Sequence, residues 1–127
     1  MLYRGEVAFR EVTGLLCNLG PLQPFELRSE LSVEVPESSK DWANKELINQ
    51  KFNQKKKELG DKYENFIFHY DIGTYVPHIA TVLQVVDDNI GFNGSRRQNI
   101  LSETFKYVGV GYGKDKNKHC FYYVFAN

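Results

Sequence analysis

The sequence predicts a mixed α/β fold of the α+β kind, in which a sheet is covered by helices. Apolar residues recur at helical spacing in the first half of the chain, strict alternation fills its last part, and another helical pattern lies between them. A chain of 127 residues is long enough to build one core. We therefore expect one domain, residues 1–127.

Composition and charge exclude several classes of protein. Sixteen basic residues balance sixteen acidic ones, so the basic excess of a nucleic-acid-binding domain is absent. No apolar run is long enough to span a bilayer. Charged residues interrupt the first 20 positions, unlike a signal peptide. If the protein is exported, we expect its signal, or a lipid anchor, to lie outside these 127 residues.

Two helical stretches are predicted before the first strand. The first has an apolar series at spacings of three and four: Ala8, Val12, Leu15, Leu16 and Leu19. It ends near Asn18 and Gly20. The second covers residues 27–50, from the spacing of Leu27, Leu31 and Val35, with an interruption at Pro36. The lysine-rich run 51–62 is expected to be a solvated face.

Strands and a third helix follow. Alternation at Phe66, Phe68 and Tyr70 predicts a strand. The next helix begins near Pro77 and has this apolar stripe: Ile79, Val82, Leu83, Val86 and Ile90. Residues 105–113 and 119–126 alternate around a polar turn and predict an antiparallel hairpin. Its glycines indicate close packing rather than a phosphate-binding loop: Gly109, Gly111 and Gly113.

Short motifs occur in an order that is informative. They are WAN at 42–44, YEN at 63–65, SRRQNIL at 95–101, YVGVG at 107–111 and FYYVF at 121–125. In this order they resemble bacterial members of the CAP superfamily (cysteine-rich secretory proteins, antigen 5 and pathogenesis-related proteins). The resemblance implies a three-layer α-β-α sandwich with a central, mostly antiparallel sheet. It also places residues 31–44 in the family's second helix.

The resemblance also implies a cleft in which the family holds two histidines and two acids, a site that binds a divalent metal in several members. Neutral imidazole is a strong zinc ligand, but Arg96 stands where the family motif has His, and residues 52–63 contain no His. A guanidinium stays protonated and cannot bind a metal. The matching acid is Glu64, and the second is Asp87 or Asp88. The residues assigned to this degenerate cleft are Glu64, Asn65, Arg96 and Arg97, with no metal, cofactor or catalytic residue.

Other polar residues are assigned structural roles. We hypothesise that Arg96 and Glu64 form an ion pair in the old cleft, and that Arg97 and Asn99 support the fold. The histidines lack ligand spacing and are expected to be structural: His69, His78 and His119. Cys17 and Cys120 lack a zinc-cluster spacing, and the sequence leaves open whether they pair.

The resemblance implies a non-catalytic binding or interaction module, secreted or on a cell surface, with host interaction as one expected role. A bacterial outer-surface lipoprotein that carries a CAP domain fits this description. The partner is then a protein or lipid and not a nucleic acid. Two alternatives stay open: lipid or sterol binding in an apolar groove between helices, and a metal-assisted hydrolase that uses Glu64 as general base.

Overall fold

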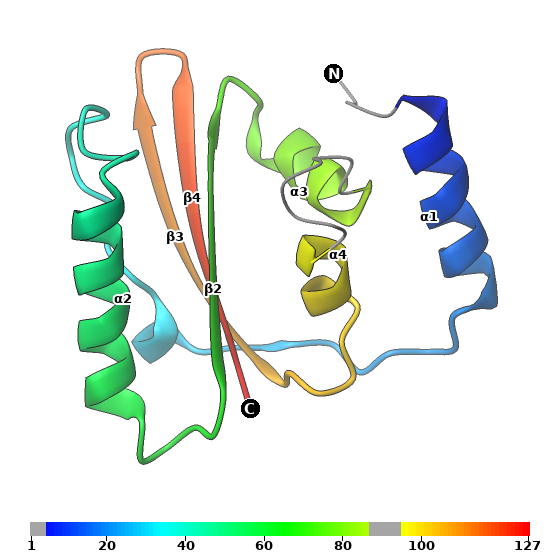
Figure 1. The fold of residues 1–127 in the computed structure, drawn as a ribbon, viewed down its shortest axis with the longest axis horizontal. Coiled ribbons are helices and arrows are strands. Elements are labelled where there is room, and N and C mark those ends of the chain that lie inside the picture. Colours follow the sequence, from blue (N-terminus) through cyan, green and yellow to red (C-terminus); the bar gives the residue numbers. More distant parts are fainter. Residues whose placement is uncertain (1–4, 87–94) are drawn as a thin grey trace. The chain divides into compact units, whose positions relative to one another are not determined.

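The computed structural model describes residues 5–86 and 95–127. In chain order the elements are α1 (Glu6–Asn18), β1 (Glu26–Leu27), the 3-10 turn η1 (Ser29–Leu31), α2 (Lys45–Leu59), β2 (Phe66–Gly73), α3 (Pro77–Val86), α4 (Ser95–Ile100), β3 (Tyr107–Asp115) and β4 (Lys118–Ala126) (Figure 1). The α+β class is therefore confirmed. Asp87 and Asp88, the candidates for the second acid, and Ile90 of the predicted stripe lie outside the described residues.

The described chain forms two compact units. The helical unit contains α1, α3 and α4 and falls within residues 1–23 and 76–103. The sheet unit contains the four strands, η1 and α2 and is drawn from residues 24–75 and 104–127.

The sheet has the strand order β1-β3-β4-β2, with β4 paired to β3 along its whole length and to β2 from His119 to Ala126. The β3–β4 and β2–β4 pairs are antiparallel, and only the short β1–β3 pair is parallel, which confirms the mostly antiparallel sheet and the predicted hairpin. Seven of the nine side chains of β4 are buried, on both faces of the sheet, so β4 is its central strand.

One face of the sheet forms the main core. Its β4 side chains are Cys120, Tyr122, Val124 and Ala126, and the residues packed on them are Leu31, Val33, Trp42, Ile48 and Tyr63. Trp42 is 1% exposed, and its indole N–H donates to Pro36 O at 2.7 Å, which satisfies the polar atom of a buried ring. Phe52 of α2 stacks on Phe68 of β2 with ring centres 4.9 Å apart, so α2 covers this face.

The three glycines of β3 let another stretch of backbone cross this face at close range. A Cβ added at Gly109 would overlap the carbonyl carbon of Leu31, and one added at Gly111 would overlap Val33 O. A Cβ at Gly113 would lie 2.8 Å from a methyl carbon of Val35. The interpretation of these glycines as close packing is confirmed, and residues 31–35 run over the glycine track, which is Gly109, Gly111 and Gly113.

The helix predicted over residues 27–50 is wrong over residues 27–44, its first three quarters. Residues 32–36 are extended, and the helix begins at Lys45 after Asn44, whose side chain accepts the Leu47 N–H at 3.2 Å. The family's second helix, placed by resemblance on residues 31–44, is wrong for the same reason. A spacing of four suits an extended chain as well as a helix, and burial of Val33 between Leu31 and Val35 shows period two.

In the helical unit, α1 ends at Asn18 as predicted and buries Ala8 and Val12 against Val86, whereas Leu15 and Leu16 of the predicted apolar series are exposed. Pro77 begins α3 as predicted. The apolar stripe predicted for α3 is wrong in part, because Ile79 and Val82 are exposed. The buried side chains of α3 are Ala80, Gln84 and Val86. The predicted and the observed buried faces of α3 are shifted by one residue. Hydropathy could not reveal the shift, because the buried face includes the polar side chain of Gln84.

Candidate functional site

The motif residues of the sheet unit are held by their backbone. Glu64 N–H donates to Asn127 O at 2.9 Å, and Asn65 N–H and Nδ2 both donate to Asn127 Oδ1, at 3.1 and 3.2 Å. The side chain of Glu64 is exposed. These bonds fix the start of β2 beside the end of β4. Asn65 therefore has a structural contact of its own.

The motif residues of the helical unit lie on α4. Arg97 is 8% exposed; its Nη2 lies 3.0 Å from Glu11 Oε1, and its Nη1 donates to Val86 O at 3.3 Å. A buried guanidinium held in this way ties α4 to α1 and to the end of α3. This agrees with the interpretation that Arg97 supports the fold. Arg96 and Glu64 belong to different units, and their ion pair stays a prediction.

The described residues alone do not supply the metal centre that the resemblance implies. In the part of the chain that the structure describes, no three His, Cys, Asp or Glu side chains converge on a metal position. His69 pairs in register with Tyr123, whereas His119 pairs with Gly73, four positions along the strand. His119 Nδ1 lies 2.8 Å from Tyr112 Oη, so one ring nitrogen already has a partner.

Sequence reasoning missed a polar cluster beside Glu64. The carboxylate of Glu30 accepts hydrogen bonds from Tyr63 Oη and from Lys62 Nζ, the second at 2.5 Å. These bonds from Lys62 and Tyr63 lower the pKa of Glu30. Burial and the same carboxylate raise the pKa of Tyr63 to about 12. Spacing within the sequence places Glu30 in a helix, so no sequence signal brings it near the YEN motif.

The cluster continues onto β3 and β1. The Arg28 guanidinium lies over the Tyr107 ring, 4.9 Å from its centre, and its Nη2 is 2.7 Å from Glu26 Oε1. Tyr63 meets Tyr107 edge-on, with ring centres 5.4 Å apart. Each of these charges has a partner of opposite sign or a ring face. The arrangement thus links the segment of Arg28 and Glu30 to residues 62–63 and to β3.

Both cysteines are free thiols in the structure. Cys17 is exposed on α1, whereas Cys120 lies in the core of the sheet unit. Burial, with a smaller effect of the Asp71 charge, raises the pKa of Cys120 to about 12. A thiol with so high a pKa is a poor nucleophile at neutral pH.

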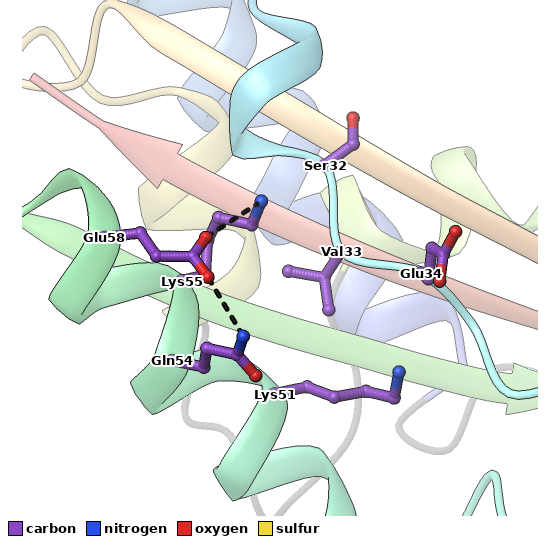
Figure 2. A pocket seen from close by; sticks show the side chains of 7 residues that line it. All are labelled: Ser32, Val33, Glu34, Lys51, Gln54, Lys55 and Glu58. Atoms are coloured by element: carbon purple, nitrogen blue, oxygen red, sulfur yellow. Dashed lines mark hydrogen bonds and ion pairs between the residues drawn. The ribbon is translucent and has the colours of Figure 1, made fainter.

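Two grooves flank the extended residues 32–34. The first, here called the helix groove, has a volume of about 320 Å³ and separates this segment from α2 (Figure 2). Its lining is Ser32, Val33, Glu34, Lys51, Gln54, Lys55 and Glu58. Glu58 accepts from Gln54 Nε2 at 3.0 Å and lies 3.8 Å from Lys55 Nζ. Two lysines and two glutamates leave this groove with no net charge.

The second groove, here called the edge groove, has a volume of about 550 Å³ and separates the same segment from β3. Its lining is Ser29, Ser32, Val33, Glu34, Val35, Glu37, Val110, Gly111 and Tyr112. Its two charged members, Glu34 and Glu37, are both carboxylates. The groove is therefore acidic, and it runs beside backbone at the margin of the sheet.

Comparison with known proteins gives similarity in structure only. No protein-family profile and no characterised protein sequence matches the chain. An outer surface protein from Borrelia burgdorferi is similar in structure, with a TM-score of 0.55 and 12% identity over 96% of this chain and 90% of that chain. A cysteine-rich secretory protein from Staphylococcus aureus aligns with a TM-score of 0.48 and 12% identity, over 95% of this chain and 36% of that one.

The likeness to the Borrelia protein shows a shared fold over nearly the whole of both chains. In the described residues 5–86 and 95–127, each helix is too short or too polar to cross a bilayer.

Proposed function

We propose that this chain is a CAP-superfamily domain that works outside the cell or on its surface as a non-catalytic binding module. The observation that carries the proposal is the fold shared with an outer surface protein over 96% of the chain. The ordered motifs from Trp42 to Phe125 point to the same superfamily. Because one fold can serve many functions, the proposal also needs support from the chemistry of the site.

The site chemistry favours binding over catalysis. Glu64, the acid that a hydrolase would use as base, is exposed rather than enclosed. Catalytic zinc usually needs three protein ligands, and Arg96 replaces one family histidine. A guanidinium supports ion pairing and not metal binding. The helix groove and the edge groove are lined mainly by polar side chains and backbone, which favours a peptide-like partner over a sterol or fatty acid.

Surface exposure is tested on intact cells that make the protein natively. Protease added outside the cells is expected to remove the protein while a cytoplasmic marker survives. Permeabilised cells provide the matched control, in which both are cleaved. Survival of the protein in intact cells, with cleavage after permeabilisation, would contradict the proposed location.

A further inference from the structure

The outer edge of β3 is open over much of its length. Strand β1 pairs with β3 at Tyr107 and Val108 and then ends. Arg28 N–H donates to Val108 O, and Val110 N–H donates to Ser32 Oγ at 3.3 Å, so backbone groups of even-numbered residues face this edge. Strand alternation gives Tyr112 the same orientation. Among the described residues, neither Tyr112 N–H nor the carbonyls of Val110 and Tyr112 have a backbone partner.

Beyond Val110 the edge lacks a paired strand because the next segment lies on the face of β3. After Arg28, the backbone turns through η1 and runs along β3 over the glycine track, where Ser32 Oγ accepts the Val110 N–H but no backbone ladder forms. The edge from Val110 to Lys114 therefore spans about 16 Å without a neighbouring strand. Val110 and Tyr112 are 41% and 49% exposed, and their side chains stand on the opposite sheet face from the glycines.

The charge of the adjoining groove defines the partner. The edge groove lies beside these backbone groups, and its charged lining is Glu34 and Glu37 alone. Edge strands in proteins are usually protected by lysines or by a covering segment. Lys114 stands at the far end of this edge, whereas beside Val110 and Tyr112 two carboxylates stand where a cationic strand would meet opposite charge.

We propose that an extended segment of a partner protein, in which Lys or Arg alternates with Val or Tyr, adds as a strand to the β3 edge. Its main chain bonds to Tyr112 N–H and to the carbonyls of Val110 and Tyr112. Its basic side chains face Glu34 and Glu37, and its apolar side chains cover Val110 and Tyr112. Main-chain bonding supplies affinity and the alternate side chains supply specificity. This inference rests on the proposed function as a binding module. It adds the chemistry of the partner, a basic and apolar extended segment.

The test uses an array of eight-residue peptides that alternate Lys or Arg with Val, Ile, Phe or Tyr, and the ¹⁵N-labelled full chain. Binders are expected to shift the amide signals of residues 110–114 and to slow hydrogen exchange at Tyr112 by about tenfold or more. Replacing the basic residues of a binder by Glu is expected to weaken binding about tenfold, the effect of two exposed charge pairs. Backbone N-methylation of the binder is expected to abolish binding.

Matched variants separate the edge groove from the helix groove. Glu37→Gln, which changes the edge groove alone, and the edge variant Val110→Lys are expected to weaken the binder, while Glu58→Gln, which changes the helix groove alone, leaves it unchanged. None of these side chains belongs to the buried core, and unchanged melting temperatures show that the variants fold.

Three results would overturn the site: no binder in the array, equal binding by the Glu and N-methylated peptides, or signals that move along α2 instead of β3. Sedimentation with and without peptide tests the competing occupant, because dimers formed through β3 without peptide would make the edge a self-interface. If the peptide experiments fail but the protein is cleaved on intact cells, the strand-addition site is wrong and the proposed function is unaffected.

Discussion

Gly111 lies where the backbone of residues 32–35 presses against β3, and a methyl group there would overlap Val33 O. The obstacle is backbone and not a flexible side chain, so relief requires the crossing segment to move. We predict that Gly111→Ala lowers the free energy of unfolding by about 3 kcal/mol, the upper part of the range for overpacking. Urea denaturation measures this.

Gly14 provides the matched control for that substitution. It is exposed in the middle of α1, and a Cβ there meets nothing within 4 Å. Gly14→Ala is therefore expected to raise the free energy of unfolding by up to about 1 kcal/mol through helix propensity. If Gly111→Ala changes the free energy of unfolding as little as Gly14→Ala does, the close contact of residues 31–35 with β3 is contradicted.

Glu30 gives a prediction in pH. Its pKa lies below the ordinary value of 4.5 because Lys62 and Tyr63 bond to the charged form. A depressed carboxyl pKa contributes stability above the unfolded-state value, and this contribution is lost as pH falls through the folded-state value. We predict that wild type is more stable than Glu30→Gln above pH 4.5 and that the difference shrinks below it.

Thermal melts across the acid range test this prediction. Glu103→Gln, at an exposed position, shows what removal of a surface carboxylate does by itself. A difference between wild type and Glu30→Gln that stays constant through the acid range would mean that Glu30 makes no bond specific to its charged form.

At the scale of elements, the β3–β4 hairpin turn contains an unfavourable residue. Lys116 has a φ of 55°, in the left-handed region where residues with a side chain are disfavoured by roughly 1–2 kcal/mol. We predict that Lys116→Gly raises the free energy of unfolding by about 0.5–1 kcal/mol, after the greater flexibility of glycine in the unfolded chain is subtracted. Chemical denaturation measures the change.

Lys116→Ala is the control for side-chain loss, because alanine keeps the steric penalty of a positive φ. It is expected to give no gain in stability. If Lys116→Ala stabilises the chain as much as Lys116→Gly, the effect comes from the lysine side chain and not from the backbone of the turn.

How well each element could be predicted depends on how many periods its pattern allows. The alternation at Phe66, Phe68 and Tyr70 allows one period, and β2 forms where expected. The spacing of Leu27, Leu31 and Val35 allows two periods. Only the fit of the crossing segment over the β3 glycines decides between them, and that fit is a tertiary contact which spacing within the segment does not contain.

At the scale of the whole molecule, the fold class could be predicted, whereas the polar cluster and the edge groove could not. Tyr63 belongs to a motif that the sequence shows, but its partner Glu30 comes from a segment whose spacing predicts a helix. The open edge of β3 depends on where β1 ends, and no composition or motif marks that point. Both features arise where segments distant in sequence meet.

The proposal on which the others depend is that a CAP-like fold here serves binding without a metal centre. Calorimetric titration of metal-free protein with Zn²⁺, paired with thermal melts, tests it most directly. We expect no stoichiometric binding and no change in melting temperature at micromolar Zn²⁺. One equivalent of tightly bound Zn²⁺ that stabilises the fold by about 2.7 kcal/mol at a hundredfold excess over Kd, and is lost in Glu64→Gln, would contradict the claim.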